Sequence, residues 1–156
     1  MTPYVEEALP GSLEEPIVKV KTMEATRTFW EKTTILHQHA HLPEDKLCPA
    51  RYSRHCTDLA VMIHAGVGNQ AADREDLLEA LVRHKIALYR QACACYEDAK
   101  RGMLRLLPAE RNMACLKKDL ASMREMFFNE PPSFESVIET LIRIENIFNT
   151  KAIPAL

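Results

Sequence analysis

The sequence predicts a mainly α-helical protein with one short strand near its N-terminus. Only 4 of its 156 residues are glycine, and apolar residues recur at helical spacing along most of the chain. Apolar residues make up 47% and charged residues 27%, as in globular chains rather than disordered or fibrous ones. This length suits one domain over residues 1–156, with a lead-in over 1–22 and a helical region over 23–150.

The lead-in is expected to be extended and acidic. Residues 1–16 contain four glutamates and no lysine or arginine. Residues 17–22 then alternate β-branched and basic side chains, which is typical of a short strand with one face in water. Because a single strand is not stable alone, this one requires a partner strand from elsewhere.

Helices are expected in the rest of the chain, between residues that favour turns and caps. We expect them at residues 25–40, 51–65, 73–100 with or without a break, 109–127, and from 133 onward. Residues 66–69 are expected to end the second helix, while Asp73 and Ser133 cap the third and the last. Residues 104–107 form a brief extended link.

Charge, hydropathy and cysteine content narrow the possible functions. Lys and Arg number 20 and Asp and Glu 22, so the chain is not a broadly basic nucleic-acid binder, although a local basic site stays open. It has neither an apolar run near the ~20 residues of a membrane span nor a secretory signal pattern, so we expect a cytoplasmic protein with no membrane association. The five cysteines lack metal-type spacing, and reduced thiols are expected.

Two groups of charged residues could carry chemistry. Lys32 lies at the edge of the apolar stripe of the helix expected at 25–40. Its ammonium is either a wet end on a packed stem or a cation held near a cleft for a phosphate. Arg51, Arg54 and Asp58 follow at i, i+3 and i+7, opposite the apolar stripe of the next helix. They form either an exposed ion pair or a carboxylate and two guanidiniums facing a ligand.

Three histidines, His37, His39 and His41, alternate along the first long helix and resemble a metal cluster in sequence. Only His37 and His41 share a helix face, and within the helix expected at 25–40 no carboxylate or thiol lies at i+4 to complete a ligand set. We therefore expect surface or helix-end histidines. A helical ligand- or metal-binding protein using His37, His41 and nearby thiols is the less favoured alternative.

The block R-T-F-W-E-K at residues 27–32, followed by R-Y-S-R-H at 51–55 and D-L at 58–59, resembles the nucleotidyl transferase AbiEii/AbiGii toxin family. Similarity at residues 3–10, 82–85, 102–108 and 119–134 extends the resemblance over nearly the whole chain. The first and second blocks in this order are fairly specific, whereas each alone would be weak.

The resemblance implies a helical, bundle-like C-terminal portion of a polymerase-β-like nucleotidyltransferase toxin from a toxin–antitoxin or abortive-infection system. Such enzymes transfer a nucleotide from an NTP, with Mg²⁺, and relatives act on RNA. By this resemblance Lys32 contacts nucleotide phosphates and Asp58 is the late acidic residue of the active site. Arg27, Arg54 and Arg51 are candidates for contact with phosphate or RNA.

The sequence departs from the family in its metal-binding residues. The family's glycine–serine turn and its D-x-D carboxylates belong to an N-terminal half that this sequence lacks. Because a catalytic metal needs close carboxylates, we expect the chain to be inactive alone, as a truncated product or one half of a split enzyme. Cys56 and Thr57 also replace two aromatic residues usual in the family, which alters the packing under Asp58.

The expected partners are the missing half or a cognate antitoxin. The alternative function is a stand-alone helical module that binds an antitoxin or another partner chain. A homodimer is also open, since an unpaired strand edge invites association.

Overall fold

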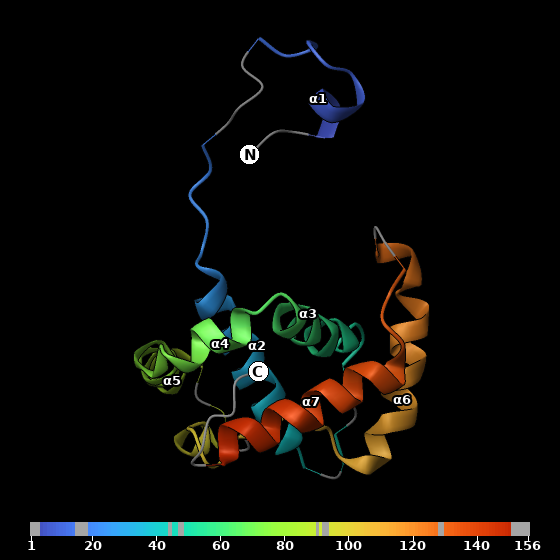
Figure 1. Ribbon diagram of the computed structural model, residues 1–156. Coiled ribbons are helices and arrows are strands. Elements are labelled where there is room, and N and C mark those ends of the chain that lie inside the picture. The colour runs from blue at the N-terminus through green and yellow to red at the C-terminus, as the bar shows by residue number, and fades with distance from the viewer. Residues whose placement is uncertain are drawn as a thin grey trace.

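The computed structural model describes residues 4–14, 19–43, 45–46, 49–89, 91, 94–127 and 130–150, and within these ranges it is helical without strands. The helices are α1 (Tyr4–Ala8), α2 (Ala25–Ala40), α3 (Ser53–His64), α4 (Val67–Ala72), α5 (Glu75–Leu88), α6 (Glu110–Ser122) and α7 (Phe134–Asn149), with 3₁₀ turns η1 (Tyr96–Asp98) and η2 (Arg124–Met126). Helices α2 to α7 gather into one body, and an N-terminal arm carrying α1 stands away from it (Figure 1). The mainly α fold is therefore confirmed.

The strand predicted at residues 17–22 is wrong where it can be checked. Residues 19–24 form neither helix nor strand and are exposed, while residues 17–18 lie outside the described residues. The arm before them buries no residue of α1. An alternating pattern needs a paired strand to become a sheet, and the described part of the chain offers none.

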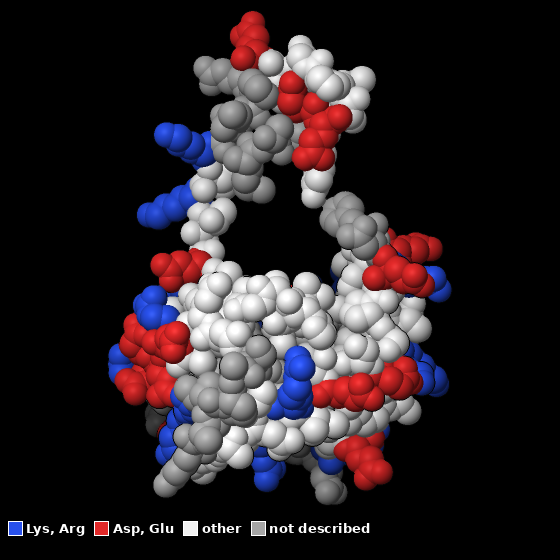
Figure 2. Space-filling model, in the orientation of Figure 1, with Lys and Arg blue, Asp and Glu red and all other residues white. Residues whose placement is uncertain are grey.

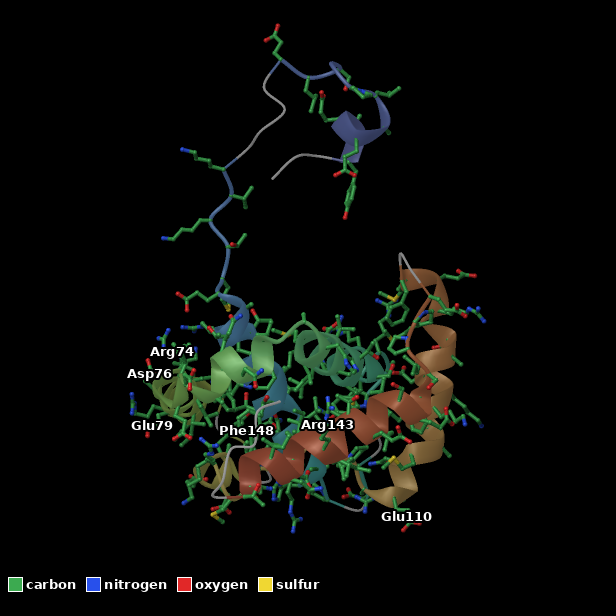
Figure 3. All side chains as sticks on the ribbon, viewed as in Figure 1. Arg74, Asp76, Glu79, Glu110, Arg143 and Phe148 are labelled. Carbon is green, nitrogen blue, oxygen red and sulfur yellow. The ribbon has the colours of Figure 1, made fainter. Side chains whose placement is uncertain are left out.

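Helix α2 is the centre of the body and has the bounds predicted from its apolar spacing. It packs against α3, α4 and α5, and its fully buried Phe29 and Trp30 meet Phe148 of α7. The ring centroids of Trp30 and Phe148 lie 5.2 Å apart in an edge-to-face arrangement, the geometry that aromatic pairs favour. Phe148, labelled in Figure 3, thus joins the last helix to the first long one.

The chain between α3 and α5 differs from the prediction. Gly66 ends α3 with a left-handed φ of 78°, as a glycine at this position does readily, but residues 67–72 then form α4 rather than a loop. Asp73 consequently lies at the C-terminal end of α4, and Arg74 occupies the N-cap position of α5. The predicted Asp73 cap is therefore wrong.

The third predicted helix is also shorter than expected. Helix α5 ends at Leu88 rather than near residue 100, and the chain returns through the 3₁₀ turn η1. Residues 104–107 form the non-helical link that the sequence predicts. This link is fixed to α7, because Leu104 exchanges two hydrogen bonds with the side chain of Asn149 and the amide of Leu106 donates to Glu145.

The last two helices follow the local signals closely. Helix α6 gives way to the turn η2 after Ser122, so the predicted helix at 109–127 breaks near its end. Ser133 caps α7 as predicted, since its Oγ accepts from the amide of Ser136 at 3.1 Å. No helix in the described ranges is long and apolar enough to cross a membrane.

Candidate functional site

Two of the predicted site residues meet where α2 and α3 pack together. The ammonium of Lys32 lies 2.5 Å from Oδ2 of Asp58, although 26 residues separate them in sequence. The side chain of Lys32 is 20% exposed and that of Asp58 47% exposed, so the stem of the lysine is packed while the ion pair remains at the surface. The pair is therefore accessible to a ligand and is held by two helices.

A third polar group, His55, completes this cluster. Its Nδ1 lies 3.3 Å from the same ammonium, and it precedes Asp58 by three residues on one face of α3. Burial, followed by the positive charges of Lys32 and Arg54, lowers the pKa of His55 from 6.5 to about 4. The imidazole is thus neutral at neutral pH and able to accept a hydrogen bond from the lysine.

Two more rings extend the cluster along the seam between the helices. His39 lies seven residues after Lys32 on α2, and its ring centroid is 4.2 Å from that of Tyr52. Tyr52 in turn contacts His55 edge-on at 6.0 Å. Burial lowers the pKa of His39 as well. The histidine rings between α2 and α3 are therefore kept uncharged beside the exposed Lys32–Asp58 pair.

The three arginines predicted for this site do not join the Lys32–Asp58 contact. Arg27 pairs with Glu31 at 3.7 Å along the surface of α2. Arg51 and Arg54 are exposed, and neither guanidinium has an ion-pair partner within the described ranges. The Arg–Asp surface pair considered from sequence is therefore not formed, because Asp58 turns to the lysine of α2.

The N-terminus of α3 has an anchor that sequence reasoning missed. The carboxylate of Asp119, on α6, accepts from the backbone N–H of Arg51 at 2.7 Å and from the N–H and hydroxyl of Ser53 at 2.8 and 2.6 Å. Arg51 has a positive φ of 63°, which is uncommon for a side chain of this kind and turns its amide toward the carboxylate. Burial opposes the charge of Asp119, but the hydrogen bonds of Ser53 and Arg51 prevail and lower its pKa.

His37 has a structural position rather than that of a metal ligand. It is fully buried, its Nε2 lies 3.1 Å from the carbonyl of Cys95, and its Nδ1 accepts from the amide of Arg105 at 3.1 Å. Both ring nitrogens are occupied, and burial lowers its pKa. Nδ1 of His41 lies 2.8 Å from the backbone carbonyl of His37. Among the residues that the structure describes, no three His, Cys, Asp or Glu side chains could hold a metal ion together.

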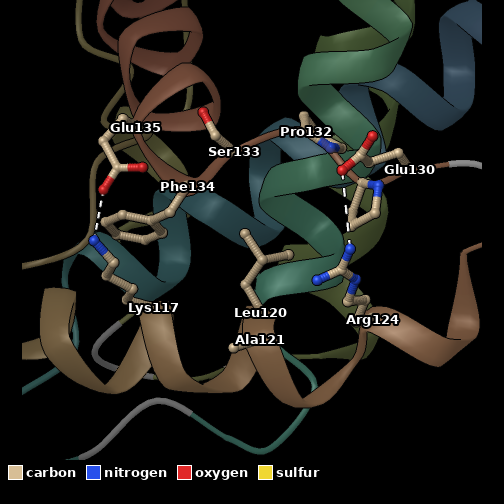
Figure 4. Close-up of a pocket in the computed structure, with 10 residues that line it drawn as sticks. Lys117, Leu120, Ala121, Arg124, Glu130, Pro132, Ser133, Phe134 and Glu135 are labelled. Carbon is tan, nitrogen blue, oxygen red and sulfur yellow. Dashed lines mark hydrogen bonds and ion pairs between the residues drawn. The ribbon is translucent and has the colours of Figure 1, made fainter.

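Several clefts of the body lie away from the Lys32–Asp58 contact. One of about 410 Å³ lies between α6 and the start of α7, with Leu120 and Phe134 among its lining residues (Figure 4). Lys117 pairs with Glu135 at 2.6 Å beside Phe134, and an Arg124–Glu130 pair flanks the other end. Figure 2 shows acidic and basic side chains interspersed over the visible face, with no continuous basic area.

Comparison with known protein families assigns the sequence to one of them. The sequence matches the family described as "Nucleotidyl transferase AbiEii toxin, Type IV TA system" over residues 1–140 of 156. No curated protein and no solved structure matches the chain. The match covers most of the sequence, including both residues of the ion pair. The chain therefore belongs to the AbiEii family of nucleotidyl transferase toxins of type IV toxin–antitoxin systems.

Proposed function

We propose that the Lys32–Asp58 pair is this chain's contribution to a site that transfers a nucleotide from an NTP to RNA. The observation that supports this most is the 2.5 Å contact between the two side chains on a half-exposed surface where α2 and α3 meet. They are also the two positions to which the family resemblance gives phosphate contact and acid chemistry. Membership of a nucleotidyl transferase family supports the same reaction class.

Lys32 has the role of phosphate contact in this proposal. An ammonium is a compact charge that interacts with phosphate oxygens from several directions. Asp58 keeps that ammonium at the surface of the seam and is the acidic group of the site. The exposed Arg51 and Arg54 then contact the phosphates or the RNA, and Arg27 does so when it leaves Glu31.

Mg²⁺ and NTP are the implied cofactors, yet the described residues fit a metal ion poorly. Phosphoryl chemistry of this kind needs close carboxylates to bind Mg²⁺. Asp58 has a lysine and a histidine beside it instead of a second acid. We therefore propose that these 156 residues do not transfer nucleotides alone and that the carboxylates come from a further segment or a partner polypeptide carrying a glycine–serine turn and a D-x-D.

The test is transfer of a labelled nucleotide from NTP to RNA, with and without such a polypeptide encoded beside this chain. We expect activity only when both are present, and its loss in Lys32→Ala or Asp58→Ala. Lys118→Ala changes an exposed lysine of α6 and is the matched control, with activity retained. Transfer by the chain alone would contradict the need for added carboxylates, and full activity of Lys32→Ala would contradict the proposed site.

A second candidate function is an interaction module that binds the cognate antitoxin or a partner chain. The N-terminal arm supports it, because Tyr4, Leu9, Val20 and Met23 are 74%, 63%, 56% and 54% exposed, which leaves several apolar side chains of the arm open to a partner. In that case binding of the co-encoded partner is lost when Leu9 and Val20 are replaced by serine. It is unchanged by Lys32→Ala, and calorimetric titration distinguishes the two results.

A further inference from the structure

We propose that His55 is a positioning residue for Lys32. The imidazole of His55 holds the ammonium of Lys32 without reducing the positive charge, and it directs the remaining N–H of the ammonium at a phosphate. This inference rests on the function proposed above. It adds a third member to the proposed catalytic pair, and three features of the structure support it.

The first feature is the number of donors on the ammonium. A lysine ammonium has three N–H groups. One donates to Asp58 at 2.5 Å and one to Nδ1 of His55 at 3.3 Å, from acceptors one turn apart on α3. Within the described ranges the third N–H has no acceptor, and the side chain is 20% exposed. The two acceptors thus fix the ammonium and leave one donor for a ligand.

The second feature is the protonation state that this contact requires. An ammonium cannot accept a hydrogen bond, so Nδ1 of His55 must carry the lone pair and Nε2 the proton. Burial and the neighbouring charges of Lys32 and Arg54 keep the ring neutral at neutral pH, against the opposing effect of Asp58. Electrostatics therefore favours the neutral ring, and the contact with the ammonium requires the tautomer with its proton on Nε2.

The third feature is the support behind the ring. Tyr52 lies edge-on to His55 at 6.0 Å, and the ring of His39 packs on Tyr52 at 4.2 Å. Packing against Tyr52 restricts the orientation of the imidazole, so that Nδ1 faces α2. A group that has to hold another one in place needs such support.

The neutral imidazole of His55 can hold the ammonium without offsetting its charge, which the carboxylate of Asp58 cannot do. Asp58 offsets the charge of the ammonium, and a bound phosphate competes with it for the same N–H groups. His55 restrains the ammonium without adding negative charge. When a polyphosphate draws Lys32 from Asp58, the imidazole keeps the lysine in place with its full positive charge available.

The first test reads the contact itself in the full ¹⁵N-labelled chain. Long-range ¹H–¹⁵N spectra at pH 7 should show His55 with Nδ1 unprotonated, and a proton on Nδ1 would overturn the proposal. In ammonium spectra, His55→Leu should speed the proton exchange of Lys32, whereas His55→Asn, whose side-chain oxygen replaces Nδ1 as acceptor, should restore slow exchange. Lys85, which donates to Thr34 at 2.7 Å, is the internal control and should not change.

The second test measures binding of inorganic triphosphate by calorimetry. We expect His55→Leu to weaken binding about tenfold, the effect of one hydrogen bond to a charged group, and His55→Asn to stay within about twofold of wild type. In a Lys32→Met background, His55→Leu should cause no further loss. If the role of His55 were purely structural, both His55 variants would bind triphosphate more weakly and would also have lower melting temperatures.

The outcomes separate this inference from the proposed function. If wild type does not bind triphosphate, the phosphate role of Lys32 fails, and the ammonium spectrum alone decides whether His55 positions the lysine. If wild type binds and His55→Leu binds equally well, the positioning role is overturned. A further loss in the Lys32→Met background also overturns it, because His55 would then act independently of the lysine.

Discussion

Two histidines, His37 on α2 and His55 on α3, have different surroundings. His37 is fully buried and uses both ring nitrogens, on the carbonyl of Cys95 and the amide of Arg105. His55 is half-buried and uses its Nδ1 on a surface ammonium that still has a donor to spare. Both have lowered pKa values because of burial, so the pKa alone does not distinguish them. His37 therefore has both ring nitrogens bonded inside the fold, whereas His55 contacts an ammonium that is partly exposed to solvent.

The largest effect should come from removing the buried ring. His37→Leu leaves the carbonyl of Cys95 and the amide of Arg105 without their partner in the interior. Unsatisfied buried groups cost ~1–3 kcal/mol each, so we expect the free energy of unfolding to fall by about 3 kcal/mol in urea denaturation. His41→Ala, at the C-cap of the same helix, is the control and should cost less than about 1 kcal/mol, since it loses one hydrogen bond and one ring contact at a half-exposed position. Equal losses in the two variants would remove the distinction between the histidines.

A smaller effect is expected from acid. Folded-state pKa values below 6.5 mean that the unfolded chain binds more protons, so stability is present above pH 6.5 and is lost as pH falls toward about 4 for His55. His37 and His39 contribute to the loss in the same direction. Asp119 adds to this loss of stability only when the pH falls to about 3.8, the ordinary pKa of an aspartate, and below.

Replacement of His55 isolates its share of this pH dependence. His55→Asn should lose about 1 kcal/mol less than wild type between pH 7 and pH 4, after allowance for solvent screening of a half-buried ring. Urea midpoints at pH 7, 6, 5 and 4 measure this difference. Identical pH profiles for the two proteins would show that folding does not lower the pKa of His55, contrary to its burial beside the Lys32 ammonium.

The sequence predicts those parts of the molecule that depend on local signals. Helix α2 has its expected bounds because its apolar stripe is regular, and Ser133 caps α7 because a serine before an apolar run is a strong start signal. Helix α4 was missed because Gly66 does end a helix, and only packing against α2 and α3 makes residues 67–72 helical. Contacts between distant segments, rather than propensity, decide such short helices.

The residues of the candidate site also divide into those that the sequence could indicate and those that it could not. The edge position of Lys32 and the resemblance of its block pointed to the lysine and to Asp58, and the structure brings the two together. His55 could have been found, since it lies one turn before Asp58 on the same helix face. Asp119 could not, because no sequence signal relates a residue of α6 to the N-terminus of α3, 66 residues earlier.

The smallest effect on stability should come from the proposed site itself. Lys32→Met keeps the packed stem and removes only the ammonium beside Asp58, whose side chain is already 47% exposed in the ion pair. Ion pairs at such positions contribute ~0–1 kcal/mol, so the free energy of unfolding should change by less than about 1 kcal/mol. Triphosphate binding should nevertheless be lost, because the charge that attracts the phosphate is gone. Thermal unfolding and calorimetry on the same preparation measure both quantities. A large loss of stability with binding retained would make Lys32 a second structural group like His37, and the contrast between the two regions would disappear.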